Sequence, residues 1–420
     1  MDSELRALAT LVVGAWIQAG CFYSLSDPLP ESCSEGLGDC DATVPGCETS
    51  LENNDRHCGT CGYDCRETSC TGTICTPVQI AAGQNRAYAI IVDDAYVYWT
   101  NDDEGNVPRN SGVWWAPKDA IDPSQAAPCA ITDSGVPRGI TQSETDIYWV
   151  DMGRAEILAV QKPCPNNNGE VLHQMAFDPQ NPAPGDLGPE PIAIALDGGS
   201  LYWTDARKGS VFANIWTLEL DTPGSAQPLL ADLPQCITAN GSCDATVEAC
   251  PCNSPWYLAV DAGYVYFTHF SSGRVGRVAR DAAGRGAVQC AGDAGGTVEG
   301  WGIVLDDSHI YWRVSLGLRV ADKEPPCGGG DVVAAGQAEL RPRDLARDGT
   351  ELFWVRGEVD SEIVSVCVDG ASERVIARAP AHGLTVDANY VYWTEWSDSR
   401  VGGVYRVARP PACGTPNRAP

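Results

Sequence analysis

The chain has 420 residues, 44% of them hydrophobic, and a formal net charge of −28. This charge repels phosphate-rich partners, and no basic stripe along the sequence offsets it, so the composition excludes nucleic-acid binding. The sequence also lacks GxSxG, HExxH, Walker A and Rossmann signatures in a strand–helix context, so none of these catalytic motifs defines it as an enzyme.

Residues 1–21 predict an export signal. The apolar run from Leu8 to Ile17 is too short for a permanent transmembrane helix but suits the hydrophobic region of a signal peptide. Asp2 and Glu4 lie where positive residues are expected, which leaves the true start of the chain open. The run ends in Gln18-Ala19-Gly20-Cys21, which resembles a bacterial lipoprotein cleavage site, although Gln18 stands where Leu is usual. The resemblance implies that Cys21 is lipidated; the alternative is an ordinary thiol behind an ordinary signal peptide.

The number of cysteines agrees with this interpretation. The chain has 19, and removing Cys21 leaves 18, which can pair completely. Eight lie between Cys33 and Cys75, and ten lie between Cys129 and Cys413. Because both groups are even, we expect disulfides and therefore an oxidising compartment outside the cytosol.

Residues 22–32 form a short polar tether, and residues 33–76 follow with eight cysteines and few aliphatic side chains. Such a segment cannot build a hydrophobic core, so disulfides or a metal must hold it together. The spacing from Cys58 to Cys61 and Cys65 also suits a zinc site, but the export signal and the even count favour disulfides. The run resembles small Cys-rich repeats of bacterial surface lipoproteins, which implies a location rather than an activity.

Residues 77–410 contain seven copies of one pattern. An aromatic pair is preceded, six positions before its second member, by Asp or in one copy by Ser143. The pairs are Tyr98-Trp99, Tyr148-Trp149, Tyr202-Trp203, Tyr266-Phe267, Tyr311-Trp312, Phe353-Trp354 and Tyr392-Trp393. Each copy reads as a strand, a tight turn and a second strand, and further short strands follow in most copies. Four strands per repeat predict the blades of a β-propeller.

The two ends of the repeat region predict how the ring closes. Only three strands remain after Leu384, whereas the segment Pro77–Ala82 precedes the first copy without a hairpin of its own. We expect this N-terminal strand to complete the seventh blade, and the repeated Trp to pack between blades. The predicted fold is therefore an all-β, seven-bladed propeller preceded by a small disulfide-rich segment; the alternative is a linear array or a sandwich of hairpins. Residues 411–420 form a tail that Cys413 is expected to clip back.

The sequences Tyr98-Trp99-Thr100-Asn101 and Tyr202-Trp203-Thr204-Asp205 resemble the YWTD motif of low-density-lipoprotein-receptor propellers and related bacterial secreted propellers. The segment Tyr392-Trp393-Thr394-Glu395 is close to it. The resemblance covers roughly residues 77–410 and implies a propeller fold. The receptor propellers usually have six blades and this chain shows seven, so their functions do not transfer.

One aligned position suggests a binding site. Eleven residues before the second aromatic of each copy lie Tyr88, Arg138, Ile192, Trp256, Trp301, Arg343 and His382. This position begins the inner strand, so we expect its side chains to surround one mouth of the central channel. All but Ile192 are aromatic, imidazole or guanidinium groups, which suit a ligand platform. The alternative is that these side chains only fill space where loops fold over the blades.

The sequence thus favours a non-catalytic, monomeric binding protein without metal or cofactor, which recognises a glycan, peptide or protein. The alternative is a metal-assisted propeller hydrolase or lyase of the lactonase type, which would need several oxygen ligands facing the channel. Asp344 is the one carboxylate directly adjacent in sequence to an aligned residue. We expect attachment to the bacterial outer membrane or cell surface through lipid on Cys21 alone, with a soluble periplasmic or secreted form as the alternative.

Overall fold

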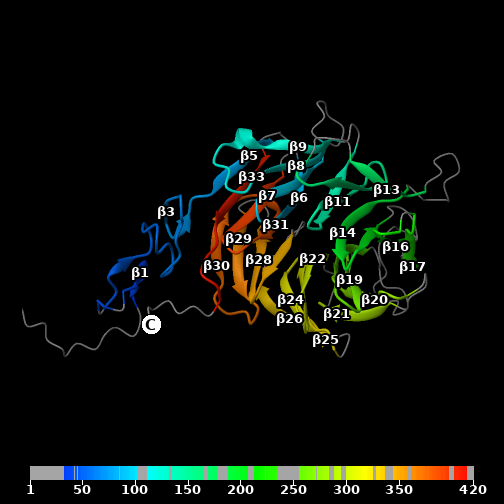
Figure 1. Cartoon of the computed structure of the whole chain (residues 1–420). Coiled ribbons are helices and arrows are strands. Elements are labelled where there is room, and N and C mark those ends of the chain that lie inside the picture. The colour runs from blue at the N-terminus through cyan, green and yellow to red at the C-terminus, as the bar shows by residue number, and fades with distance from the viewer. Residues whose placement is uncertain are drawn as a thin grey trace, which may run out of the picture.

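The computed structural model describes residues 33–413 except 42, 45, 85, 103–110, 132–134, 165–168, 177–187, 207–211, 223, 235–254, 271, 283–287, 295–298, 325–327, 336–343, 358–360 and 397–401. The signal segment, Cys21, the tether and Arg343 therefore lie outside the described residues. Within them, the chain forms a wheel of antiparallel sheets with a small N-terminal module at one side (Figure 1). The fold is the all-β, seven-bladed propeller that the repeats predict.

Each blade has four antiparallel strands, which follow one another from the innermost to the outermost. Blade 1 is β6 (Ala87–Val92), β7 (Tyr96–Asn101), β8 (Gly112–Pro117) and β9 (Ala127–Ile131); blade 2 is β10 (Pro137–Gln142), β11 (Asp146–Asp151), β12 (Glu156–Gln161) and β13 (Glu170–Gln174); blade 3 is β14 (Pro191–Asp197), β15 (Ser200–Asp205), β16 (Phe212–Glu219) and β17 (Gln227–Pro234). Blade 4 is β18 (Pro255–Val260), β19 (Tyr264–His269), β20 (Val275–Ala279) and β21 (Gln289–Asp293); blade 5 is β22 (Gly300–Leu305), β23 (His309–Val314), β24 (Gly317–Asp322) and β26 (Asp331–Ala335). Blade 6 is β27 (Leu345–Asp348), β28 (Glu351–Arg356), β29 (Glu362–Cys367) and β30 (Arg374–Arg378); blade 7 is β31 (Ala381–Val386), β32 (Tyr390–Glu395), β33 (Gly402–Ala408) and β5 (Val78–Gln84).

Two short elements complete this wheel. The strand β25 (Gly328–Gly329) pairs in parallel with the outer edge of blade 4, and the 3₁₀ turn η1 (Pro123–Gln125) follows β8. No helix among the described residues is long and apolar enough to cross a membrane.

The N-terminal strand β5 closes the ring, as predicted. It pairs antiparallel with β33, the last strand among the described residues, with Ala81 opposite Val404 and Gln79 opposite Tyr405. The Gln79 side-chain amide also donates a hydrogen bond of 2.9 Å to the Tyr405 hydroxyl. Because the first and last strands of the propeller share one sheet, the wheel cannot open without breaking this ladder.

The second aromatic of each repeat lies in the core between blades, as predicted. The indoles of Trp99, Trp149, Trp203, Trp312 and Trp354 are fully buried, and Trp393 is 1% exposed. Each buried aromatic removes roughly 150–250 Å² from water. These rings supply much of the apolar packing that the short strands cannot supply alone.

In blades 1, 4, 5 and 7 the repeated Asp organises the turn between the first two strands. In blade 7, Asp387 Oδ1 accepts hydrogen bonds from the backbone N–H groups of Asn389 and Tyr390, and Oδ2 accepts one from the Tyr392 hydroxyl at 3.0 Å. Lys118, which directly follows the third strand of blade 1, donates to the same Oδ2 at 2.8 Å. The repeated Asp therefore shapes its own turn and also binds a cation from the next blade.

An ion pair with the repeated Asp recurs at six junctions. In five of them the cation directly follows a third strand, whereas Arg347 lies on the inner strand β27 because Val368 follows the third strand of blade 6. The pairs are Asp387–Lys118 at 2.8 Å, Asp93–Lys162 at 3.1 Å, Asp197–Arg280 at 2.5 Å, Asp261–Lys323 at 2.7 Å, Asp306–Arg347 at 3.8 Å and Asp348–Arg409. The junction of blades 2 and 3 differs, because Ser143 replaces the Asp and Leu220 occupies the position that Lys162 has in blade 2. Both halves of the pair are thus replaced together, which leaves this junction without the ion pair.

The N-terminal module is held by disulfides rather than by zinc. It contains two small hairpins, β1 (Leu37–Gly38) with β2 (Thr49–Ser50) and β3 (Cys70–Thr71) with β4 (Ile74–Cys75). Its eight cysteines form the disulfides Cys33–Cys47, Cys40–Cys61, Cys58–Cys70 and Cys65–Cys75. This pairing leaves no thiolate in the module for a metal, which agrees with the preference drawn from the sequence.

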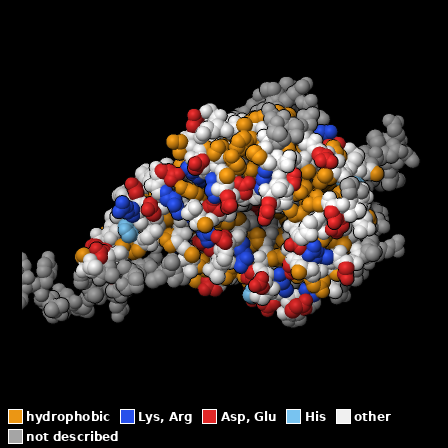
Figure 2. Space-filling view, viewed as in Figure 1, with side chains coloured by type: hydrophobic (Ala, Val, Ile, Leu, Met, Phe, Trp, Pro, Cys, Tyr) orange, Lys and Arg blue, Asp and Glu red, His pale blue; other side chains and the backbone are white. Residues whose placement is uncertain are grey.

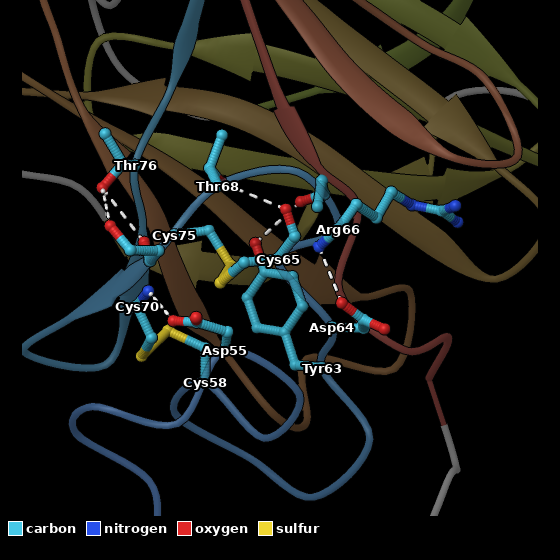
Figure 3. Close-up of a disulfide and its surroundings, with 12 residues drawn as sticks. Asp55, Cys58, Tyr63, Asp64, Cys65, Arg66, Thr68, Cys70, Cys75 and Thr76 are labelled. Atoms are coloured by element: carbon cyan, nitrogen blue, oxygen red, sulfur yellow. Dashed lines mark hydrogen bonds between the residues drawn. A yellow bond between two sulfur atoms is a disulfide. The ribbon is translucent and has the colours of Figure 1, made fainter.

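The module packs against blade 7. The buried Tyr63, beside the two disulfides seen in Figure 3, donates a hydrogen bond of 2.7 Å to the Ala408 carbonyl. Arg66 donates to the Asn389 side chain at 2.8 Å, and Glu67 forms an ion pair of 2.6 Å with the buried Arg406. The module is therefore docked on the closing blade rather than only joined to it by the chain.

Further disulfides lie in the propeller. Cys129 pairs with Cys164 between blades 1 and 2, and Cys367 pairs with Cys413, which clips the C-terminal segment to blade 6 as predicted. Cys290 on β21 is also disulfide-bonded. Together with the module, these bonds indicate an exported or extracellular protein.

Candidate functional site

The aligned side chains lie where the inner strands begin. Tyr88, Arg138, Ile192, Trp256, Trp301 and His382 are each the second residue of an inner strand. Each of these strands has a register irregularity at this point; in β6, for example, it falls between Ala87 and Ile90. A bulge of this kind turns a side chain away from the regular alternation of the strand. The six described residues therefore occupy equivalent positions at the same end of the inner strands, and we refer to these positions as the rim.

Threonine hydroxyls hold this rim in place. The Thr394 hydroxyl accepts a hydrogen bond of 2.8 Å from the Gly383 N–H and donates one of 3.0 Å to the Tyr88 carbonyl in the next blade. Thr100 bonds in the same way to the Ala89 N–H and the Arg138 carbonyl. Thr204 likewise joins the Ala193 N–H to the Trp256 carbonyl. The Thr after the aromatic pair thus connects neighbouring inner strands beside the rim, a signal that the sequence contains and our prediction did not use.

The first rim cluster joins blades 1, 2 and 7. The ring centroids of Tyr88 and His382 lie 4.4 Å apart, and His382 stacks on Trp396 at 5.1 Å. The Arg138 guanidinium lies over the Tyr88 ring, 4.6 Å from its centroid. Three predicted residues therefore meet, together with Trp396, which the alignment missed because it lies outside the repeated pattern.

The charge of Arg138 is already neutralised in this cluster. Its Nη1 lies 2.5 Å from Oδ2 of Asp102, whose side chain is fully buried. Tyr88 is only 8% exposed, so its ring mainly supports the cluster. Arg138, His382 and Trp396 are half-buried and remain accessible in part.

The second rim cluster joins blades 4 and 5. The Trp256 ring lies 4.7 Å from Phe270 and 6.1 Å from Trp301, between centroids, and all three rings are half-buried. The indole nitrogen of Trp256 is a buried atom without a hydrogen-bond partner among the described residues. The predicted tryptophans thus meet, and Phe270 is an addition that the aligned position could not reveal.

Two tyrosines connect the two sides of the channel. The side chains of Tyr88 on β6 and Tyr257 on β18 lie close enough to affect each other's ionisation, and burial raises the pKa of both hydroxyls. Blades 1 and 4 lie across the wheel from each other (Figure 1). This contact therefore connects two inner strands whose blades are not neighbours in the ring.

A half-buried carboxylate lies in the same region. Asp344 precedes β27, and its negative charge acts on both Tyr88 and Tyr257. Its Oδ1 accepts a hydrogen bond of 2.9 Å from the Leu345 N–H, and Oδ2 accepts a longer one of 3.5 Å from the Leu384 N–H. Burial raises the pKa of Asp344 to about 6, although these two N–H groups act in the opposite direction.

No described cation forms an ion pair with Asp344. The carboxylate of blade 6 also lies close to blade 5, because a Cβ added at Gly302 would stand 3.2 Å from Asp344 Oδ1. Gly302 directly follows Trp301, as Tyr257 directly follows Trp256. The Asp344 carboxylate therefore lies against the inner strand of blade 5, at the residue after Trp301.

The aligned residues are thus not a continuous ring of ligand groups. They separate into a cluster of Tyr88, Arg138 and His382 and a cluster of Trp256 and Trp301, while Arg343 lies outside the described residues. Between the clusters on one side, Ile192 is buried. The arrangement can present two aromatic surfaces above a channel that contains tyrosine hydroxyls and the Asp344 carboxylate.

Comparison with known proteins supports the fold and no more. No family model and no curated protein matches the sequence. Among solved structures, a streptogramin B lyase is similar with a TM-score of 0.54 and 14% identity, covering 80% of this chain and 97% of that one. The Neurospora crassa Pan2 WD40 domain is similar with a TM-score of 0.52 and 8% identity, covering 80% and 96%. A nidogen/laminin complex matches with a TM-score of 0.36, 13% identity and coverage of 74% and 86%.

At these identities the similarity shows the β-propeller fold alone. The nidogen match is too weak to extend the resemblance to YWTD propellers. The lyase match shows that an enzyme shares this architecture, but its activity cannot be transferred at 14% identity. The fold therefore defines a class of protein, and the function must be argued from the site.

Proposed function

We propose that this protein is an exported binding protein, anchored to the cell surface by lipid on Cys21, whose propeller captures a peptide, protein or glycan at the channel rim. The observation that carries the proposal is the pair of partly exposed aromatic clusters at the same end of the inner strands. Half-buried aromatic rings offer large, rigid contact surfaces at a small entropic cost.

The metal-assisted hydrolase remains the competing proposal. It requires several oxygen ligands that converge in the channel. Among the described residues, the groups of three or more His, Cys, Asp or Glu side chains close enough to share an ion lie in the N-terminal module, and their cysteines are disulfide-bonded. The aromatic rim and the deep carboxylate of Asp344 support binding over hydrolysis.

A peptide and glycan array tests the proposal with three variants. Trp256→Ala and Trp301→Ala each remove one rim surface, whereas Trp115→Ala removes a half-buried indole that packs on Tyr96 in blade 1. We expect the rim variants to lose at least about tenfold in affinity for the captured ligand, because stacked aromatic contacts commonly dominate such sites. The Trp115 variant should bind like the wild type. Equal binding by all four proteins would exclude the rim as the site.

Two further measurements address the rest of the proposal. Mass spectrometry of the mature protein should find lipid on Cys21 and no free thiols; an unmodified Cys21 would contradict the anchor. Metal analysis of the purified protein with and without chelator should find no tight stoichiometric cation. A cation held in the channel would favour the hydrolase instead.

A further inference from the structure

The deep carboxylate of Asp344 is the feature of the channel that the fold itself does not explain. A buried carboxylate without a cationic partner is unfavourable, and proteins usually pair such a group or coordinate a metal with it. Asp344 has only the N–H groups of Leu345 and Leu384 as hydrogen-bond donors among the described residues, and the second contact is long. An apolar or amide side chain at position 344 would fit the propeller without this energetic cost.

The surroundings of Asp344 suit a positive ligand group. In the first cluster, Arg138 and Asp102 neutralise each other at 2.5 Å, so the Asp344 carboxylate is left as a negative charge without a described counter-ion. The negative charge of Asp344 acts on the side chains of Tyr88 and Tyr257. The rim indole of Trp256 is on the same inner strand as Tyr257, and that of Trp301 is on the inner strand of blade 5. Aromatic faces attract cations, most strongly where water is excluded.

The charge of the whole chain acts in the same direction. A net charge of −28 creates a field that draws cations toward the surface and raises their rate of encounter. Acidic and basic side chains are interspersed over the face seen in Figure 2, without a basic patch that would repel an approaching ammonium group. The long-range field and the local site therefore favour the same kind of ligand.

We propose that the rim binds a cationic ligand, a lysine-bearing peptide, whose ammonium group passes between the two aromatic clusters and pairs with Asp344. The inference rests on the proposed binding function and specifies the ligand chemistry of that site. In this complex the rim indoles contact the aliphatic part of the lysine side chain, and the Asp344 carboxylate neutralises its ammonium group. The role of Arg138 is then to hold the first cluster through Asp102 rather than to meet the ligand.

A titration with paired peptides tests this proposal. The probes are the tripeptide acetyl-Gly-Lys-Gly-amide and its Nε-acetylated form, which differ in one charge, and binding is followed by tryptophan fluorescence at about 150 mM salt, where surface attraction is screened. The proteins are the wild type, Asp344→Asn, and Asp307→Asn, which removes an exposed acid of the same charge from an outer turn. Thermal unfolding confirms that each variant is folded.

We expect the wild type to bind the lysine peptide at least tenfold more tightly than its acetylated form. Asp344→Asn should lose this preference, and Asp307→Asn should keep it. If both variants lose the preference for the lysine peptide equally, or if neither loses it, the attraction is unspecific and the proposal is overturned. If Asp344→Asn does not fold, the wild type decides: a preference below about threefold overturns the proposal, whereas a tenfold preference kept by Asp307→Asn supports it.

The test separates this inference from the function on which it rests. Binding of uncharged glycans or of the acetylated peptide that depends on Trp256 and Trp301 would retain the rim as the site and refute the cationic ligand. Binding that depends on neither tryptophan would refute both.

Discussion

The hydroxyl of Thr394 offers the sharpest test of how the rim is built. The substitution Thr394→Val keeps the shape of the side chain and removes one oxygen. Val150 and Val355 occupy the equivalent positions of blades 2 and 6, so a valine fits there sterically. The change therefore isolates two hydrogen bonds at the junction of blades 7 and 1.

The size of the effect follows from what the valine leaves behind. Thr394 is fully buried, and its loss leaves the Gly383 N–H without its 2.8 Å acceptor. The Tyr88 carbonyl loses its 3.0 Å donor and keeps only the contact with the His382 ring. Burying an unsatisfied group costs about 1–3 kcal/mol, so we expect the free energy of unfolding to fall by about 2–3 kcal/mol.

Urea unfolding monitored by tryptophan fluorescence measures this loss. With a denaturant dependence of about 3 kcal/mol per molar urea, the midpoint should fall by about 1 M. The control Thr350→Val changes an exposed threonine in a turn of blade 6 and should leave the midpoint unchanged. A fall of less than about 0.2 M for Thr394→Val would refute the assignment of these hydrogen bonds as a structural link.

Three further predictions concern the junctions and the module. Backbone amides along the junction of blades 2 and 3, marked by Ser143 and Leu220, should exchange hydrogen faster than those between blades 4 and 5, where Lys323 binds Asp261; equal protection would contradict the role of the ion pairs. Replacing Cys367 and Cys413 together by Ser should cost up to about 4 kcal/mol in unfolding free energy, since this bond closes a long loop, and an unchanged urea midpoint would refute it. Tyr63→Phe should make the N-terminal module more sensitive to protease by removing its buried bond to Ala408, whereas cleavage at the wild-type rate would show that the module is held by other contacts.

The fold could be predicted because it repeats. The fixed spacing from Asp93 to Trp99 recurs in every blade, and each member has a local task, the Asp in a turn and the Trp in the core. The strand at Val78–Gln84 could be assigned to blade 7 because a ring must pair its ends. Strand periodicity and the number of strands in each repeat are sufficient for both predictions.

The site was less accessible to the same reasoning. Trp396 and Phe270 follow the second strands of their blades and lie outside the repeated pattern. Their contacts with His382 and Trp256 are therefore visible only in the three-dimensional structure. Tyr257 follows an aligned residue and reaches across the channel, a contact between blades 1 and 4 that no local pattern encodes.

The docking of the module is a second contact that the sequence could not reveal. Tyr63 and Ala408 are far apart in the chain, and the module has no repeat that would place it.

The sequence nevertheless contains a signal for the hydrogen bonds beside the rim. Thr100, Thr204, Thr268 and Thr394 recur after their aromatic pairs, and a buried threonine at a fixed position predicts a specific hydrogen bond.

Asp344 is a carboxylate without a described cationic partner, and the pH dependence of stability tests directly whether the fold compensates its charge. Its pKa rises from 3.8 to about 6 on folding, so the folded wild type loses stability as the pH rises through this range and does not regain it above. Two pKa units correspond to at most about 3 kcal/mol. Asp387 is the opposite case: burial would raise its pKa, but Lys118 and the turn N–H groups outweigh this and lower it.

The decisive measurement is the unfolding free energy of the wild type, Asp344→Asn and Asp387→Asn between about pH 4 and pH 8. We expect Asp344→Asn to match the wild type near pH 4 and to become the more stable protein above pH 6. Asp387→Asn should be less stable than the wild type at pH 8, with a deficit that shrinks only as the pH falls below about 4. An Asp344→Asn variant that is less stable than the wild type at pH 8 would show that the carboxylate is compensated within the fold, and would contradict the site described for this channel.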